Sequence, residues 1–128
     1  MVKPKMAMLQ ATPVDFLPWE GMIPAFWATM QDIAGAPYEK EPERYERLSL
    51  KNYIRPDNPP ILFLEAEYEH LFPSEHTKKL VALHNEWGIK SYWKVYSKAE
   101  HGFFFELTRK SQLEALEDIC HYIDFGKL

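Results

Sequence analysis

The chain has 128 residues, a length that predicts a single domain comprising residues 1–128. Hydrophobic residues make up 46%, aromatic residues 15% and charged residues 27%, a composition that indicates a folded globular protein and excludes a disordered one. The net charge of −4, without a block of like charges, argues against partners such as nucleic acid or an anionic membrane.

The remaining composition signals concern the cellular compartment. The single cysteine, Cys120, excludes an internal disulfide and fits a reducing compartment. Residues 1–16 lack the long apolar run and the small-residue cleavage site of a signal peptide. No run reaches the ~18 apolar residues of a membrane span, and no Cys/His cluster predicts a metal or another cofactor. We therefore expect a cytoplasmic, soluble chain without a cofactor.

The first half of the chain predicts one strand followed by helices. Residues 6–11 are a short apolar run, which predicts a buried strand. Residues 19–33 carry apolar side chains at helical spacing. Residues 37–60 are polar and marked by prolines, with a helical turn predicted at 42–48. We interpret residues 6–58 as a strand plus a cap-like helical excursion within the same domain.

The second half, residues 59–128, alternates clearly between strands and helices. Residues 61–64 form a continuous apolar run, as parallel strands buried on both faces do. A helix is predicted at 74–87, an aromatic-rich strand at 91–96 and a closing helix at 111–125. This βαβα order predicts an α/β fold with a small parallel sheet of about three strands flanked by helices.

The two helices predicted in the second half, at 74–87 and 111–125, have apolar stripes that should face the sheet. The first begins with Ser74 as its expected N-cap. Its stripe consists of Leu80, Val81, Leu83, His84 and Trp87. The stripe of the second helix consists of Leu113, Leu116, Ile119, Cys120 and Ile123. Cys120 is therefore expected in the core and not as a nucleophile.

Titratable side chains follow both strands of the second half. Glu69 lies in the loop after the first strand, and His101 lies in the loop after the second. Because catalytic groups collect beyond the carboxyl ends of strands in open α/β sheets, parallel neighbours would bring Glu69 and His101 to one edge. A carboxylate that orients an imidazole is the acid–base pair of a hydrolytic triad.

The two loops resemble motifs of the α/β-hydrolase superfamily of carboxylesterases, lipases and peptidases. Members carry a stretch similar to His-Gly-x-x-Asp-x-x-Val-Pro after their seventh strand and a Gly-His-Gly-Phe after the eighth. Residues 65–73, Glu-Ala-Glu-Tyr-Glu-His-Leu-Phe-Pro, resemble the first motif, with Glu69 at the acid position. Residues 100–103, Glu-His-Gly-Phe, resemble the second, with His101 as the base. The resemblance covers roughly residues 6–125 and implies the C-terminal portion of such an esterase or lipase.

The sequence also departs from the family pattern. Glu65-Ala66 stands in place of His-Gly, the acid is Glu instead of Asp, and Glu100 replaces the Gly before the histidine. No Gly-x-Ser-x-Gly nucleophile elbow is present, and all five serines lack the glycine turn that exposes a nucleophile. The resemblance therefore implies a lobe that supplies the acid and the base of a triad without its nucleophile, inactive by itself.

The resemblance also suggests residues that would line a substrate pocket beside the triad. Phe103, Phe72 and His70 are the candidates. For the aromatic run that begins at Phe103, plain core packing is an equally good interpretation. For His70, beside Glu69, a position on the loop surface is the more frequent case.

An incomplete sheet predicts a partner. The strand at residues 6–11 would lie at an edge, where unpaired N–H and C=O groups favour pairing with another strand. The partner would be a second copy, giving a homodimer, or a separate chain that carries the missing N-terminal hydrolase lobe. A complemented lobe would act on a small-molecule ester. The alternative is a non-catalytic binding or assembly module, or a truncated fragment, that dimerises through this edge.

Overall fold

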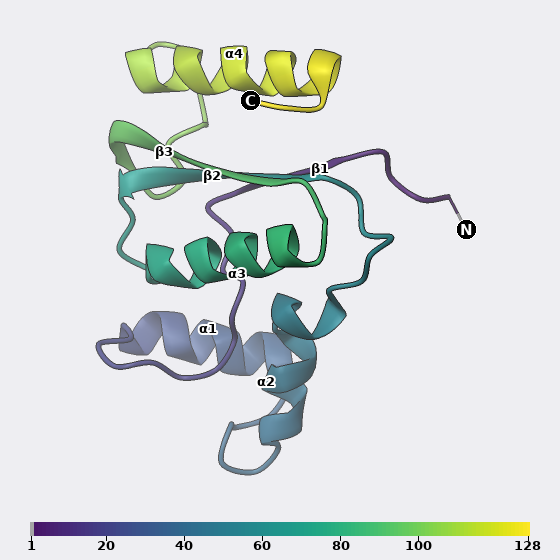
Figure 1. The fold of residues 1–128 in the computed structure, drawn as a ribbon. Coiled ribbons are helices and arrows are strands. Elements are labelled where there is room, and N and C mark those ends of the chain that lie inside the picture. The colour runs from purple at the N-terminus through teal and green to yellow at the C-terminus, as the bar shows by residue number, and fades with distance from the viewer. Residues whose placement is uncertain (1) are drawn as a thin grey trace.

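The computed structural model describes residues 2–128 and has a three-stranded parallel sheet between helical layers. The strands are β1 (Ala7–Gln10), β2 (Ile61–Tyr68) and β3 (Ser91–Glu100), in that spatial order. The helices are α1 (Pro24–Ala34), α2 (Pro42–Leu48), the 3₁₀ helix η1 (Leu50–Tyr53), α3 (Ser74–Glu86) and α4 (Lys110–Phe125). Figure 1 shows α4 on one face of the sheet and α3 on the other, with α1 and α2 beyond α3. The predicted α/β fold class is confirmed.

The central strand β2 explains why the sheet is parallel and buried on both faces. Its residues from Ile61 to Ala66 are all buried, as the continuous apolar run predicts. Leu62 and Leu64 pack on the α4 side with Tyr122, whereas Ile61 and Phe63 pack on the other side with Leu80 of α3 and Val14. The two side-chain faces of β2 therefore organise two separate clusters of the core.

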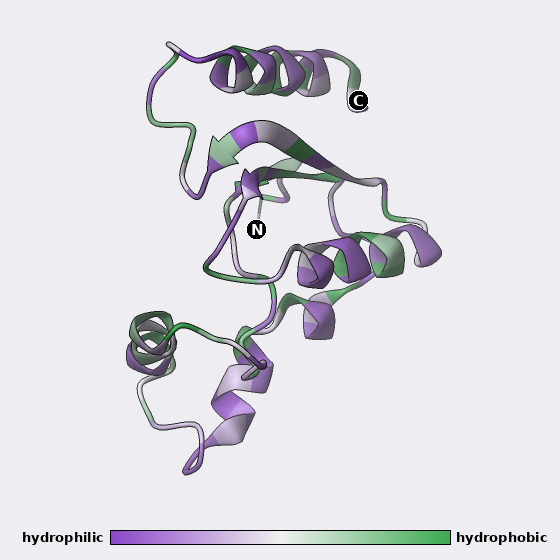
Figure 2. Cartoon of the chain, turned by 90° about the vertical axis from the view of Figure 1, so that its left-hand side faces the viewer, coloured by the Kyte–Doolittle hydropathy of each residue, from purple (hydrophilic) through white to green (hydrophobic). Residues whose placement is uncertain are grey.

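The colouring in Figure 2 shows apolar residues along the sheet and mixed hydropathy along α3 and α4. Mixed hydropathy is the pattern of helices that bury one face and leave the other in water. Within residues 2–128, no helix is both long and apolar enough to cross a membrane.

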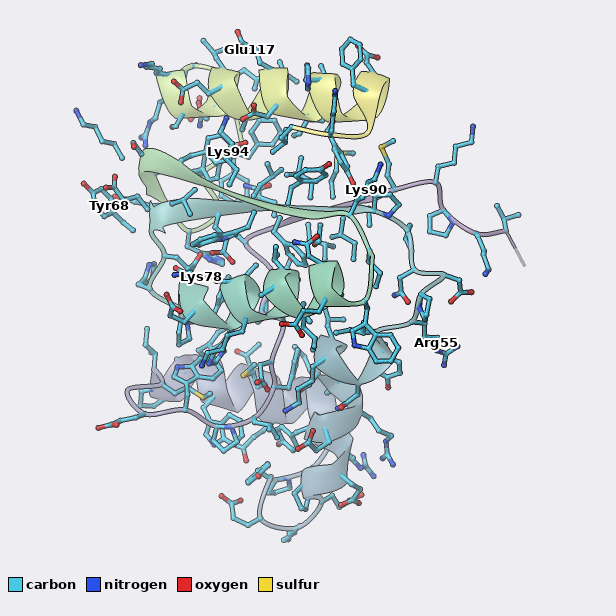
Figure 3. The ribbon with its side chains drawn as sticks, in the orientation of Figure 1. Arg55, Tyr68, Lys78, Lys90, Lys94 and Glu117 are labelled. Carbon is cyan, nitrogen blue, oxygen red and sulfur yellow. The ribbon has the colours of Figure 1, made fainter. Side chains whose placement is uncertain are left out.

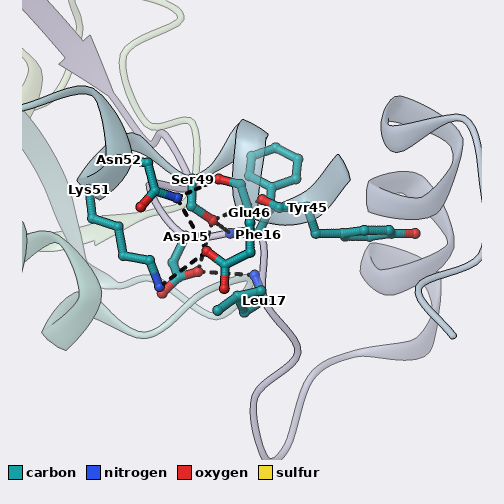
Figure 4. Close-up of polar contacts among 8 residues, drawn as sticks. All are labelled: Asp15, Phe16, Leu17, Tyr45, Glu46, Ser49, Lys51 and Asn52. Carbon is teal, nitrogen blue, oxygen red and sulfur yellow. Dashed lines mark hydrogen bonds and ion pairs between the residues drawn. The ribbon is translucent and has the colours of Figure 1, made fainter. Parts of the chain in front are cut away.

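Polar contacts join the segment after β1 to the end of α2 (Figure 4). The Oδ1 atom of Asp15 accepts hydrogen bonds from the Ser49 hydroxyl (3.1 Å) and from the Leu17 N–H (3.0 Å). The Ser49 Oγ also accepts the N–H of Phe16 at 3.0 Å, and Ser49 is fully buried. These bonds satisfy polar groups of an irregular segment that is partly removed from water. The helical excursion is thereby anchored to the chain that leaves the sheet.

Two predicted helix starts were wrong. α1 begins at Pro24 and not at residue 19, because Gly21 adopts a positive φ of 80° in a turn and Pro24 is suited to the first helical turn. In α3, Ser74 is the first helical residue and the N-cap is Pro73, which forms no side-chain cap. Pro73 has φ −69° and ψ 126° and is therefore the last extended residue before the helix. Its ring fixes φ near a value that also suits the start of a helix, so Ser74 can be the first helical residue.

The predicted apolar stripe of α4 was wrong in part. Leu113 is 46% exposed, Ile123 is 52% exposed and Cys120 is exposed, so Cys120 is not in the core. The buried positions are Ser111, Gln112, Ala115 and Tyr122. The Gln112 side chain sets this rotation of the helix, because its Nε2 donates to the Phe103 carbonyl (2.7 Å) while its Oε1 accepts two backbone N–H groups. Trp87, predicted on the stripe of α3, lies just past the helix end and is 52% exposed.

The contrast between the buried and exposed leucines gives a stability prediction. Leu62 is 0% exposed at the centre of β2, so Leu62→Ala should lower the free energy of unfolding by about 2–5 kcal/mol. Leu113→Ala, at a half-exposed position on α4, is the matched control and should cost less than about 1 kcal/mol. Urea unfolding followed by circular dichroism measures both values, and equal losses in the two variants would contradict the assigned core.

Candidate acid–base site

The site lies where β2 and β3 end at the same edge of the sheet. In the parallel pairing, Tyr68 is the register partner of Glu100, so the next residues, Glu69 and His101, leave the two strands side by side. Tyr68 is labelled in Figure 3 at this end of β2. Parallel pairing therefore brings together two residues that are far apart in the sequence.

The length of β3 is essential to this placement. The strand runs to Glu100 instead of ending near residue 96, and the register between β2 and β3 is irregular between Ala66 and Tyr68. Lys98 adopts a positive φ of 56° there, and its N–H donates to Glu67 Oε2 at 2.7 Å. This irregularity is a β-bulge, and its polar residues interrupt the alternation of apolar positions that indicates a strand. The sequence pattern therefore predicts a strand that is too short.

The side chains of Glu69 and His101 are hydrogen bonded to each other. The His101 Nδ1 lies 2.7 Å from Glu69 Oε2 and 2.9 Å from Oε1. The carboxylate also accepts the N–H groups of His70 (3.0 Å) and Leu71 (2.9 Å), and its side chain is 0% exposed. Hydrogen bonds to a charged group are among the stronger ones, so the loop fixes the carboxylate and the carboxylate fixes the imidazole. The His101 side chain is 30% exposed, and its Nε2 has no hydrogen-bond partner in residues 2–128.

Gly102 forms the sharp turn that follows His101. Its φ is 69°, a conformation that side chains other than glycine rarely adopt. A Cβ atom there would also lie only 2.8 Å from the Phe105 ring. The turn is closed by a hydrogen bond from the Phe103 N–H to the Glu100 carbonyl (3.0 Å). Glycine is therefore favoured by the backbone conformation, whereas the exposed Phe105 ring could move to admit a Cβ atom.

The three candidate pocket residues occupy two different environments. Phe72 is buried with its ring edge-on to His101, 6.1 Å between centroids, and His70 lies 6.2 Å away in a similar orientation but is exposed. Phe103 packs instead into the core, 5.2 Å from the Tyr96 ring, with 7% of its surface exposed. Phe72 and His70 thus adjoin the imidazole, whereas the position of Phe103 favours the core-packing interpretation.

A second carboxyl group, which sequence reasoning did not identify as part of the site, lies inside β2. Glu65 is 2% exposed; its Oε2 accepts the indole N–H of Trp93 (2.8 Å), while Oε1 has no partner among the described residues. The hydroxyl of the buried Thr77 is also without a partner there. Burial raises the pKa of the Glu65 carboxyl; hydrogen bonding to it opposes the rise in part, and the negative charge of Glu69 adds to it. Its signal in the sequence is a glutamate directly after four apolar strand residues.

Solved structures similar to the chain include Thermogutta terrifontis esterase 2, the acylaminoacyl peptidase of Pyrococcus horikoshii and a puromycin hydrolase. Their TM-scores are 0.67, 0.75 and 0.76, and the alignments cover 97%, 94% and 97% of this chain. The fold is that of part of an α/β-hydrolase. The predicted resemblance to that superfamily is confirmed at the level of the fold.

The similarity to these solved structures covers only part of each of them. The chain spans 42% of the length of the esterase chain and 19% of the length of each of the other two chains. Sequence identity is 20%, 15% and 20%, respectively, so the likeness concerns the fold alone. No protein-family model matches the sequence, and no curated relative matches it.

The environment of Glu65 generates a prediction about pH. Because the pKa of this carboxyl is raised in the folded state, its contribution to stability is complete below its ordinary pKa of 4.5 and is lost as the pH rises towards the folded-state value. Glu65→Gln keeps an acceptor for Trp93 and cannot ionise. The variant should therefore gain stability relative to the wild type as the pH rises above 4.5.

Chemical unfolding at several pH values measures this difference. Glu106→Gln, at an exposed loop position, is the control and should follow the wild type. Glu65→Leu should lose about 1–3 kcal/mol relative to the wild type below pH 4.5, because the Trp93 N–H would be left without an acceptor, and this loss should become smaller as the pH rises. A constant difference between wild type and Glu65→Gln across the pH range would contradict the assignment.

Proposed function

We propose that this chain supplies the acid and the base of a serine-type carboxylic ester hydrolase of the esterase/lipase kind. The observation that supports this proposal is the hydrogen bond of 2.7 Å between Glu69 and His101, formed at the carboxyl edge of a parallel sheet. The α/β-hydrolase fold of the chain agrees with it. The nucleophilic serine would come from a segment outside the 128 residues, because no Gly-x-Ser-x-Gly elbow occurs in them.

In the proposed reaction, Glu69 holds the imidazole with Nδ1 protonated and Nε2 free to act as the base. Nε2 would take the proton of the serine hydroxyl as its oxygen attacks the ester carbonyl, and would then give that proton to the leaving alcohol. The buried Glu69 carboxylate would stabilise the imidazolium formed in between. Phe72 and His70, which adjoin the imidazole, are the proposed contacts for a small-molecule ester.

The free edge of β1 is the proposed attachment point for the serine-bearing segment. β1 pairs only with β2 and has no neighbour on its other side in residues 2–128. Met8, within β1, is 37% exposed. An edge strand with unpaired backbone groups and exposed apolar surface favours the addition of another strand. A hydrolase lobe that adds its own strand there would continue the sheet and bring a nucleophile to the same carboxyl edge.

A chimaera tests the roles of the two residues. The chain would replace the segment of Thermogutta terrifontis esterase 2 with which it superposes, so that the rest of that enzyme completes the sheet. We expect the chimaera to hydrolyse a p-nitrophenyl ester, whereas the 128-residue chain alone should remain at the background rate. His101→Ala should lower kcat about 10⁴-fold or more, and Glu69→Gln about 10²- to 10⁴-fold, because the tautomer would no longer be fixed.

His121→Ala is the matched control for the histidine, since this residue lies on the exposed side of α4. It should leave kcat unchanged. The proposal would be wrong if a folded chimaera hydrolysed the ester equally well with and without His101, or if the isolated chain showed activity that depends on this residue.

A second candidate function, assembly of identical chains, is favoured by the same open edge. Ala7 and Ala11 donate their N–H groups to the β2 side, so the alternating backbone directs the N–H of Met8 towards the free edge. A homodimer joined there should have a mass above the 15.1 kDa of one chain in light scattering at high concentration. Met8→Pro should return it to a monomer because proline has no N–H.

Met8→Ala removes the same apolar side chain but keeps the N–H, and is the control that should remain a dimer. A wild-type chain that stays monomeric at high concentration would exclude assembly through this edge and leave the hydrolase lobe as the proposed partner.

A further inference from the structure

Residues 18–48, which include α1 and α2, form a helical unit with a small aromatic core of its own; we call it the outer unit. The ring of Trp27 lies 5.3 Å from that of Tyr45 and 5.9 Å from that of Tyr38, measured between centroids. The Tyr45 hydroxyl donates to the Ala36 carbonyl (2.5 Å). Neither hydrophobic cluster around the sheet includes a described residue of the outer unit. Figure 2 shows its helices standing away from the sheet.

An aromatic contact joins the outer unit to the body of the protein. The ring of Trp19 lies edge-on to the imidazole of His76, in the first turn of α3, at 5.2 Å between centroids. The hydrogen bonds of the outer unit are made within it or to residues 49–53, which follow it directly. The outer unit can therefore open while the sheet stays intact, as locally less stable segments of proteins do.

A cavity lies at the seam between α3 and the two segments that enter and leave the outer unit. It has a volume of about 250 Å³, and both sides of the seam contribute charged or titratable side chains to its lining: Asp15 and Lys51 from the excursion, His76 and Lys79 from α3. A seam that encloses this much space is packed less densely than a core, so its two sides can separate with the loss of few contacts.

The surroundings of His76 favour its neutral form while the seam is closed. Burial lowers the pKa of the imidazole; the carboxylate of Asp15 opposes this in part, and the positive charges of Lys79 and Lys51 lower the pKa further. Lys51 belongs to η1, across the seam from α3. A proton on His76 would thus create a partly buried charge and a repulsion between the two sides.

We propose that protonation of His76 releases the outer unit from α3, so that this contact is a pH-sensitive latch. The latch lies in the first turn of the helix that follows β2, at the same edge of the sheet as the acid–base pair, so its release would change the access to that edge. The inference does not depend on the proposed hydrolase function.

The direction of the pH dependence follows from the two states of the imidazole. In the released state the ring is hydrated and has its ordinary pKa of 6.5, whereas in the docked state the pKa is lower. The released state therefore binds more protons at a pH between these two values. Docking is strongest above pH 6.5 and weakens as the pH falls below that value towards the docked-state pKa.

Hydrogen exchange of the full chain, followed by mass spectrometry, tests the proposal. Protection would be measured at about pH 7.5 and about pH 5.5 and corrected for the intrinsic exchange rate at each pH. Because isolated helices of 11 and 7 residues are too short to be stable, the amides of α1 should exchange whenever the outer unit is released. We expect the protection of residues 24–34 to fall by up to about ten-fold over this range, the limit for one titrating group. Residues 61–68 of β2 report global unfolding and should stay better protected at both pH values.

Variants assign the response to one imidazole. His76→Phe keeps an aromatic ring against Trp19 but cannot be protonated, so it should remove the pH response of α1; if this variant fails to fold, the uncharged His76→Gln replaces it. His121→Phe, on the exposed side of α4, is the matched control and should respond as the wild type does. Asp15→Asn keeps a hydrogen-bond acceptor but removes the charge that favours the imidazolium, so it should enlarge the response.

Equal pH responses in the wild type and in the His76 variant would overturn the proposal. Exchange of residues 24–34 and 61–68 with one common protection would also overturn it, because the outer unit would then open only when the whole chain unfolds. A smaller response in Asp15→Asn than in the wild type would contradict the electrostatic origin of the latch.

Discussion

The parallel pairing of β2 with β3 is the constraint on which the rest of the structure depends. It buries the apolar run that begins at Ile61 on both faces, which requires helices above and below the sheet. It also makes the two strands end together, so that the side chains of Glu69 and His101 meet. Fold and candidate site are thus two consequences of one set of backbone hydrogen bonds.

Much of this could be predicted from the sequence because the signals are local and redundant. A continuous apolar run, a helix-length amphipathic segment and an aromatic-rich strand each have their own pattern, and their order limits the topology to a right-handed parallel crossover. The acid and the histidine follow from that topology, since carboxyl ends of neighbouring parallel strands share an edge. For this reason the pairing of Glu69 with His101 could be anticipated, while their chemical role remains a proposal.

What could not be predicted depends on contacts that only the folded chain makes. The rotation of α4 follows from the amide of Gln112, which bonds a loop carbonyl and two loop N–H groups, so Leu113 and Cys120 turn outward despite their apolar character. Glu65 was overlooked because a single glutamate normally faces water, and here a tryptophan from the neighbouring strand lets it remain inside. Pattern arguments describe one element at a time, whereas these features involve two.

The irregular pairing at Lys98 has a consequence for how far the histidine reaches. Between the register pairs Ala66–Tyr96 and Tyr68–Glu100, β2 advances by two residues while β3 advances by four. At a rise of about 3.3 Å per residue, the surplus corresponds to roughly 7 Å of backbone. The bulge therefore acts as a spacer between the core and the rim, with Ser97 and Lys98 exposed and Ala99 held in the core. A change in the length of its exposed part would move the imidazole along the rim of the sheet, an adjustment open to sequence divergence and to protein engineering alike.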